Sequence, residues 1–212
     1  MKKIAISVHA TENFSINILS GLKNFDYIHV DVMDGKFVKN KNLNLDTFRI
    51  LKKNFKTPII AHLMVVNPFD YIEKIIHYLD TFMFHFEIDN KYDKIINEIK
   101  RYDKNVGLAI NPDTEIHRIV GYLKDLNIVL IMGVNPGWAG QKFLPNTVNK
   151  VNELVKYKNT YDFYIDVDGG VNLDNAKQLI NADILTSSST ILKAKNPNKI
   201  IQLFKESDKN GH

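Results

Sequence analysis

The feature of this sequence that most constrains its fold is a repeating alternation of short apolar runs and longer amphipathic segments. Eight runs are rich in β-branched residues and have the length of buried strands; they lie near residues 4–8, 27–33, 58–64, 82–87, 105–110, 127–133, 162–167 and 183–187. Between them, apolar residues recur three or four positions apart, as in an amphipathic helix, over Leu45–Phe55, Asp70–Leu79, Tyr92–Tyr102, Ile116–Leu123, Thr147–Tyr157 and Asp174–Ile180. Repeated strand–helix units are typical of a parallel sheet covered by helices.

Eight such strands predict an α/β fold of the (β/α)8 or TIM-barrel type. A chain of 212 residues with 44% hydrophobic and 25% charged residues suits one sizeable core better than two. We therefore expect a single domain over residues 1–212, in which residues 207–212 form a polar C-terminal tail. A doubly wound open sheet is the alternative architecture for the same alternation.

Composition excludes several classes of protein. The chain has no cysteine, so any metal must be held by histidine and carboxylate side chains. The net charge of +4 suits an anionic ligand, but the lysines are scattered, so we expect no nucleic-acid partner. No apolar stretch approaches the roughly 20 residues of a membrane span, and the N-terminal segment lacks the apolar run of a signal peptide. The expected location is therefore cytoplasmic, with no membrane partner.

Polar side chains interrupt the predicted strands near their carboxyl ends. His29, Asp31 and Met33 alternate in the segment HVDVMDG, so they share one face of the second strand. Other strands carry comparable residues: His62 and Met64 in the third, His85 and Glu87 in the fourth, and Asp168 at the end of the seventh. Barrel enzymes have their active sites at this end of the strands. A lone histidine in an apolar strand is more often a hydrogen-bonded core residue, which is the plainer interpretation of His85.

The acidic residues of this group require a positive partner. Burying an unpaired charge costs several kcal/mol, which is comparable to the net stability of a domain, so Asp31 and Asp168 need a compensating cation. Together with His29 and His62 they form a set of two imidazoles and two carboxylates, which suits Zn²⁺, Fe²⁺ or Mn²⁺. The sequence therefore predicts one divalent metal ion.

Glycine and serine follow the later strands. The segments are NPGWAGQKF at Asn135–Phe143, DGG at Asp168–Gly170, and SSS at Ser187–Ser189. Glycine lets backbone N–H groups approach an anion closely, and barrels frequently bind phosphate at the loops after strands seven and eight. Glycine is also common in ordinary turns, so glycine alone is weak evidence for a phosphate site. The stronger evidence is the position of these loops opposite the acidic cluster.

Several long motifs resemble those of the ribulose-phosphate 3-epimerases. HVDVMDGKFV, AHLMVVNP, VGLAINPDT, VLIMGVNPGWAGQKF and IDVDGGVN follow one another in the order of that family, from Ser7 to about Ile191. The resemblance implies a barrel fold and an isomerase of carbohydrate metabolism. Its substrates would be the sugar phosphates D-ribulose 5-phosphate and D-xylulose 5-phosphate of the pentose phosphate pathway. It also implies a homo-oligomer.

The resemblance assigns roles to individual residues. It implies that His29, Asp31, His62 and Asp168 bind one divalent ion, which would be Zn²⁺, Fe²⁺, Mn²⁺ or Co²⁺. Asp31 and Asp168 would also be the catalytic pair, because inversion at carbon 3 removes a proton from one face and returns one to the other. The metal would stabilise the enediolate between the two steps. The residues implied to contact substrate are Ser7, His62, Met33, Met64, Met132, Gly137, Trp138, Ala139, Gly140, Gly169, Gly170, Ser188 and Ser189.

Some positions depart from the family pattern and leave alternatives open. The first strand continues as SVHATEN, and the positions usually occupied by His, Pro, Gly and Gly are here Lys36, Lys39, Ala139 and Ser188. These changes leave the length of the substrate open. A D-allulose-6-phosphate 3-epimerase of the same superfamily is the alternative, for which Asp70–Tyr71 and the GWAGQ segment argue. A non-catalytic metal- or sugar-phosphate-binding relative is a third hypothesis, against which the intact metal-binding set argues.

Overall fold

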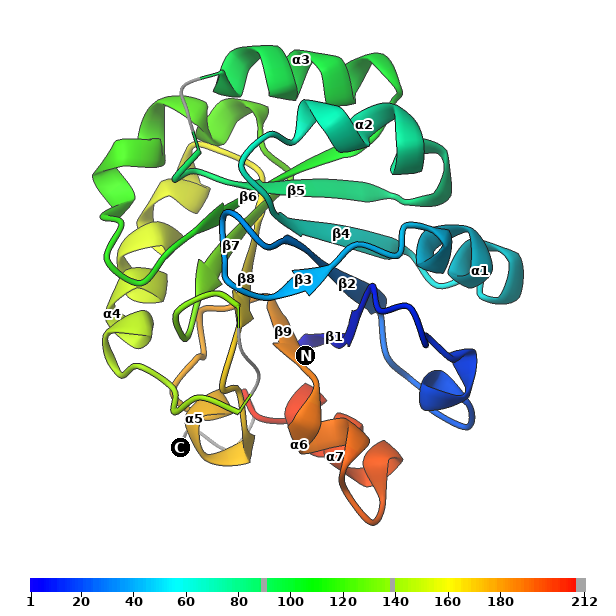
Figure 1. The fold of residues 1–212 in the computed structure, drawn as a ribbon. Helices are drawn as coiled ribbons and strands as arrows, with labels where there is room; N and C mark the ends of the chain where they lie inside the picture. Colours follow the sequence, from blue (N-terminus) through cyan, green and yellow to red (C-terminus); the bar gives the residue numbers. More distant parts are fainter. Residues whose placement is uncertain (89–90, 138–139, 209–212) are drawn as a thin grey trace.

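The computed structural model describes residues 1–88, 91–137 and 140–208, and these form a closed barrel of parallel strands surrounded by helices (Figure 1). The barrel strands are β1 Lys3–His9, β2 Tyr27–Asp34, β4 Ile59–Met64, β5 Thr81–His85, β6 Asn105–Ile110, β7 Ile128–Met132, β8 Tyr164–Asp168 and β9 Ile184–Ser187. Each of the eight predicted strands is present, with ends shifted by up to about two residues. The sequence did not indicate β3, Lys41–Asn42, which pairs antiparallel with the end of β2.

The pairing of the first strand confirms the barrel and rules out the open sheet. β1 pairs in parallel with β9 on one side and with β2 on the other, so the sheet closes on itself. In the register between β1 and β2, Ser7 lies opposite His29 and His9 lies opposite Asp31. An open sheet would leave both of its edge strands with one neighbour only.

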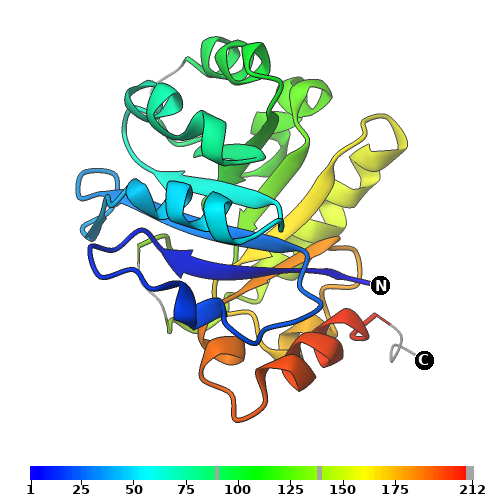
Figure 2. The same cartoon turned by 90° about the vertical axis from the view of Figure 1, so that its right-hand side faces the viewer.

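The helices lie outside the barrel, as Figure 1 and the view from its right-hand side in Figure 2 show. The α-helices are α1 Asp46–Asn54, α2 Phe69–Ile75, α3 Tyr92–Arg101, α4 Asn146–Leu154, α5 Leu173–Ala176, α6 Ser189–Leu192 and α7 Pro197–Lys205. Short 3₁₀ helices are η1 Ile16–Leu19, η2 Ile76–Tyr78, η3 Ile116–Asp125 and η4 Val155–Asn159.

Several helical segments differ from their expected form. Ile116–Leu123 belongs to a 3₁₀ helix, in which the buried Ile116 and Ile119 are three positions apart, matching three residues per turn. The segments expected over 70–79 and 147–157 begin as α-helices and end as 3₁₀ turns. Helix α7 was not predicted, although its start has a clear signal: the Asn196 side chain caps it and Pro197 is its first residue.

Apolar side chains pack on both faces of the barrel sheet. Polar residues are found instead at the carboxyl end of the barrel. The outer layer packs the helices onto the sheet, with Phe48, Leu51 and Phe84 fully buried. The inner layer fills the barrel with Ala5, Ile60, Met83, Ala109, Ile128, Leu130, Met132, Val134 and Ile184. Gly107 makes room for one of them, because a Cβ atom at Gly107 would lie 2.7 Å from Met83 Cβ.

The end of the described chain packs against its beginning. The Lys2 backbone N–H donates to the Lys205 carbonyl oxygen, and Ser207 is buried. Asp208 forms an ion pair with the Met1 amino group, and residues 209–212 of the expected tail lie outside the described residues. None of the helices in the described ranges has the length and apolar character needed to cross a membrane.

Candidate metal centre and active site

Strand register brings the predicted polar residues together at one end of the barrel. Alternate residues of a strand point to the same side, so His29 and Asp31 on β2 both face inward. The pairing of β2 with β4 places Asp31 opposite His62, and the pairing of β7 with β8 places Met132 opposite Asp168. These four strands therefore deliver their polar or sulfur-containing side chains to one region, although β2 and β8 lie far apart in the sequence.

His29, Asp31, His62 and Asp168 form a compact cluster whose ligand atoms all lie within 4.8 Å of one another. Asp31 Oδ1 is 2.9 Å from His62 Nδ1 and 3.3 Å from His29 Nε2. Asp168 Oδ2 is 3.8 Å from His29 Nε2 and 3.9 Å from His62 Nδ1. Ligand bonds of about 2.0–2.2 Å in a tetrahedral site place ligand atoms roughly 3.3–3.6 Å apart, so the cluster has the dimensions of a divalent metal site.

The histidine on β2 supplies an independent test of that fit. Both ring nitrogens of His29 are buried and have no hydrogen-bond partner among the described residues. The 3.3 Å contact to Asp31 is within ion-pair distance but lacks hydrogen-bond geometry. A buried polar atom without a partner costs about 1–3 kcal/mol, and a cation bound to Nε2 would remove this cost. The buried cluster is therefore consistent with a divalent metal site.

The pKa values of the two aspartates are shifted in opposite directions. Burial raises the pKa of Asp31, but its contacts with His29 and His62 outweigh burial and hold that pKa well below its usual range. Burial and the negative charge of Asp31 raise the pKa of Asp168. Burial lowers the pKa of His29, but its contact with Asp31 outweighs burial and raises the pKa to about 9. The cluster thus stabilises added positive charge, whether from protons or from a metal.

A cavity of about 260 Å³ opens at this end of the barrel beside the cluster. Twelve of the residues predicted to act on or contact substrate line it: Ser7, Asp31, Met33, Met64, Met132, Gly137, Gly140, Asp168, Gly169, Gly170, Ser188 and Ser189. His62 does not line the cavity and lies behind Asp31. Trp138 and Ala139 lie outside the described residues.

The loop after β8 owes its shape to its two glycines. Gly169 has φ +104° and Gly170 has φ +67°, a region of backbone conformation that residues with a side chain rarely adopt. A Cβ atom on Gly169 would lie 2.5 Å from Val134 Cγ2, and one on Gly170 would lie 2.9 Å from the Phe143 backbone nitrogen. The glycines therefore let this loop pack directly on the segment that follows β7. Ser188, at a position where glycine is common, has φ −114°, which lies outside the left-handed region that favours glycine.

Some cavity residues were not among the predicted site residues. His9 lines the cavity, and its Nδ1 is 3.2 Å from the Asn42 side-chain nitrogen. The available signal was its position two residues after Ser7, which places both side chains on the same face of β1. Asn135, Asn172 and Thr190 also line the cavity from the loops after β7, β8 and β9.

A closed α/β barrel with a buried histidine–aspartate cluster and glycine-rich loops at the carboxyl ends of its strands has the architecture of barrel enzymes that act at this end. The chain belongs to the ribulose-phosphate 3-epimerase family, an isomerase family whose model matches residues 4–192, and this confirms the resemblance drawn from the motifs.

Two curated relatives are similar over most of their length. The ribulose-phosphate 3-epimerase of Buchnera aphidicola subsp. Baizongia pistaciae is 36% identical over 224 aligned residues, covering 99% of this chain and 98% of the relative. The cytoplasmic isoform of ribulose-phosphate 3-epimerase from Oryza sativa subsp. japonica is 33% identical over 190 residues, which cover 86% of this chain and 82% of the relative. The crystal structure of 3-hexulose-6-phosphate synthase from Salmonella typhimurium is similar in fold alone, with a TM-score of 0.71 and 14% identity. The match covers 99% of this chain and 100% of that one.

Proposed function

We propose that this chain is a divalent-metal-dependent 3-epimerase that interconverts D-ribulose 5-phosphate and D-xylulose 5-phosphate in the pentose phosphate pathway. The observation that carries the proposal is the meeting of two carboxylates, Asp31 from β2 and Asp168 from β8, in one buried cluster beside one cavity. The relative from Buchnera that covers 99% of this chain supports the choice of reaction, because its name is that of a ribulose-phosphate 3-epimerase.

His29, Asp31, His62 and Asp168 would hold the metal ion. When bound, a divalent metal supplies Lewis-acid stabilisation of the negative charge that develops on the substrate oxygens after deprotonation. The candidates are Zn²⁺, Fe²⁺, Mn²⁺ and Co²⁺, because the ligand set contains imidazole and carboxylate groups and no thiolate.

The two aspartates carry out the proton transfers in this proposal. One carboxylate removes the proton from carbon 3, and the other carboxyl group returns a proton on the opposite face. Asp31 Oδ2 accepts a hydrogen bond from the Ser7 hydroxyl at 2.8 Å, which fixes the orientation of this carboxylate. Since epimerisation runs in both directions, the two residues exchange roles as base and acid.

The remaining cavity residues would bind the sugar phosphate. Met33, Met64 and Met132 would exclude water from the reacting carbon, and backbone N–H groups at Gly137, Gly140, Gly169 and Gly170 would bind the phosphate together with Ser188 and Ser189. Trp138 and Ala139 belong to the same proposed substrate contacts.

Asp31→Asn and Asp168→Asn test the two-base reaction. Each variant is expected to lose about 10²- to 10⁴-fold or more in kcat, because asparagine cannot transfer a proton. Metal content must be measured in the same samples, since both residues are also proposed ligands. Loss of turnover with metal retained supports proton transfer by the replaced residue; substantial turnover by either metal-loaded variant contradicts the scheme.

The alternative function, epimerisation of the six-carbon substrate D-allulose 6-phosphate, is tested by measuring kcat/KM with this compound and with D-ribulose 5-phosphate. Asp70 and Tyr71, which suggested this alternative, lie in α2, and neither is among the residues that line the described cavity. We therefore expect ribulose 5-phosphate to be preferred. A strong preference for the hexulose phosphate would replace the pentulose phosphate in the proposal while leaving the two-base chemistry in place.

A cytoplasmic location and a homo-oligomeric state complete the proposal. The printed name of the rice relative, a cytoplasmic isoform, supports the location. Light scattering on the purified protein tests the assembly, which is expected to be larger than the 24.4 kDa of one chain. A monomer at micromolar concentration would contradict it.

A further inference from the structure

A line of buried and partly buried polar side chains leads away from the histidine–aspartate cluster on the side of His62 opposite Asp31. His62 Nε2 lies 2.9 Å from His85 Nε2, and both imidazoles are fully buried. His85 Nδ1 lies 3.1 Å from Glu87 Oε2. Each of these contacts needs one hydrogen atom, so the hydrogen positions on the two imidazoles depend on each other.

Glu87 determines where the hydrogens of this line must lie. Its Oε1 accepts a hydrogen bond from the Asn111 backbone N–H at 2.8 Å and another from the Thr114 hydroxyl. Burial raises the pKa of Glu87, but its hydrogen bonds with His85, Thr114 and Asn111 outweigh burial and lower it. Glu87 is therefore an ionised carboxylate with no hydrogen to donate, and His85 must donate from Nδ1.

The hydrogen on His85 Nδ1 decides the state of His62. A neutral His85 with its hydrogen on Nδ1 has a lone pair on Nε2, so the 2.9 Å contact must use a hydrogen from His62 Nε2. A second hydrogen on His85 would place a buried imidazolium next to the proposed metal site. In a neutral His62, Nδ1 then has a lone pair that lies 2.9 Å from Asp31 Oδ1. These two acceptor atoms repel unless a metal ion or a second proton lies between them.

We propose that His85 and Glu87 are positioning residues that hold His62 in the tautomer with its hydrogen on Nε2, leaving Nδ1 free to bind a divalent metal. Metal-binding histidines commonly donate their other N–H group to a carboxylate or carbonyl oxygen. Here a second imidazole stands between the ligand and the carboxylate. The inference rests on the metal site of the proposed function and extends it by two residues that touch neither metal nor substrate.

Glu87→Gln distinguishes this role from packing, because glutamine has nearly the same shape but opposite hydrogen-bonding demands. The Asn111 N–H can only donate, so the carbonyl oxygen of the new amide must face it, and the amide NH₂ must face His85 Nδ1. His85 must then accept at Nδ1 and donate from Nε2. His62 must accept at Nε2, and its hydrogen moves to Nδ1, where it blocks metal binding.

Metal affinity is the primary readout. The metal-stripped wild type and the Glu87→Gln variant are titrated with Co²⁺ and Zn²⁺ in competition with a chromophoric chelator. We expect affinity to fall about 10- to 100-fold in the variant, the usual effect of changing a residue that orients a metal ligand. We also expect the visible absorption spectrum of bound Co²⁺ to change. Affinity within two-fold of wild type, in a variant that folds normally, would overturn the proposal.

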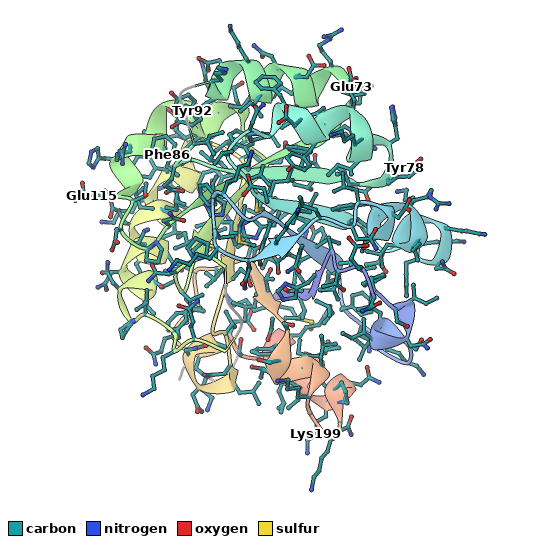
Figure 3. The ribbon with its side chains drawn as sticks, in the orientation of Figure 1. Glu73, Tyr78, Phe86, Tyr92, Glu115 and Lys199 are labelled. Carbon is teal, nitrogen blue, oxygen red and sulfur yellow. The ribbon has the colours of Figure 1, made fainter. Side chains whose placement is uncertain are left out.

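Glu115→Gln is the matched control. Glu115 also pairs with an imidazole, at 3.2 Å from His117 Nδ1, but both side chains are largely exposed, and Figure 3 shows Glu115 at the periphery of the molecule. The same chemical change there should leave metal affinity unchanged. An equal loss of affinity in both variants would indicate a general effect of removing a negative charge and would also overturn the proposal.

Nitrogen NMR of the wild type, labelled with ¹⁵N-histidine, needs no variant and decides the tautomer even if Glu87→Gln fails to fold. The expected result is a hydrogen on His62 Nε2 and a metal-dependent shift at His62 Nδ1. Metal contact at Nε2, or a hydrogen retained on Nδ1, would overturn the assignment. A wild type that binds no divalent metal would refute the proposed metal site itself, whereas metal binding that is insensitive to Glu87→Gln would refute only the positioning role.

Discussion

A neutral imidazole has one hydrogen and one lone pair, and the residues around it determine which nitrogen carries which. At the mouth of this barrel the three buried histidines have different surroundings. Within the part of the chain that the structure describes, His29 has no hydrogen-bond partner on either ring nitrogen. His62 lies between Asp31 and His85, and His85 lies between His62 and Glu87. Two of these histidines, His29 and His62, therefore belong to the candidate metal site, whereas His85 contacts only His62 and Glu87 behind it.

The partly buried carboxylate of Glu87 makes stability depend on pH. Its pKa in the folded protein is lowered from its ordinary value of 4.5, so its contribution to stability is fully present above that value and is lost as pH falls through the lowered pKa. Hydrogen bonds to a charged group contribute about 1.5–3 kcal/mol, so Glu87→Gln should cost about that much at pH 7. The variant should lose less free energy of unfolding than wild type as pH falls below 4.5.

Urea unfolding of the metal-stripped proteins between pH 7 and pH 3.5 measures this difference. Glu115→Gln is again the control and should follow the wild-type curve, because its carboxylate is exposed. Parallel curves for wild type and Glu87→Gln would show that Glu87 is not preferentially ionised in the folded state.

At the scale of the elements, the loop between β8 and α5 has a backbone conformation that depends on glycine and asparagine at particular positions. The loop between β8 and α5 packs against the segment after β7 at distances that leave no room for side chains at Gly169 and Gly170. The Asn172 side chain then caps the short helix α5, accepting hydrogen bonds from the backbone N–H groups of Asp174 and Asn175. The loop is therefore held at both ends while its glycines line the cavity.

Gly169→Ala should destabilise the protein. A non-glycine residue at φ +104° costs about 1–3 kcal/mol, and the new Cβ atom would also meet Val134 Cγ2 at 2.5 Å. With about 2–4 °C per kcal/mol for a chain of this size, Tm should fall by several degrees in differential scanning calorimetry. Gly121→Ala is the control, because Gly121 is exposed and its Cβ would meet nothing within 4 Å. Equal Tm values for the two variants would contradict this account of the loop.

At the scale of the whole molecule, the histidine–aspartate cluster joins strands that are distant in sequence. His29 and Asp31 lie on β2, His62 lies on β4, and Asp168 lies on β8. Strands β1 and β9 lie between β2 and β8 in the closed barrel. Burying two carboxylates so close together opposes folding unless positive charge is added. A metal bound there would stabilise only the folded barrel, since the unfolded chain does not hold the four groups together.

Metal removal should therefore lower both activity and thermal stability. A ligand at 100 times its Kd adds about 2.7 kcal/mol to the free energy of unfolding. Adding Zn²⁺, Mn²⁺ or Co²⁺ to the chelator-treated protein should raise Tm and restore turnover. Asp168→Asn should show a smaller rise, because one ligand is weakened. If no divalent ion changes the Tm of the wild type, the cluster is not a metal site.

Local patterns in the sequence were sufficient to predict much of the fold and the composition of the site. The period of two in HVDVMDG places His29 and Asp31 on one face, and the eight apolar runs give the number of barrel strands. The glycines after β8 indicate a backbone that a side chain would obstruct. These features depend on residues close together in the chain, so the sequence displays them directly.

Other features were decided by tertiary structure. The closure of β1 onto β2 excludes the open sheet, and the contact between His62 and His85 depends on how β4 and β5 pack. His85 was expected to be a hydrogen-bonded core residue, and it is one, but only the fold shows that its partners are His62 and Glu87. Distances between side chains on different strands depend on strand register and on barrel closure. Both arise from packing among residues far apart in the chain, so no local pattern contains them.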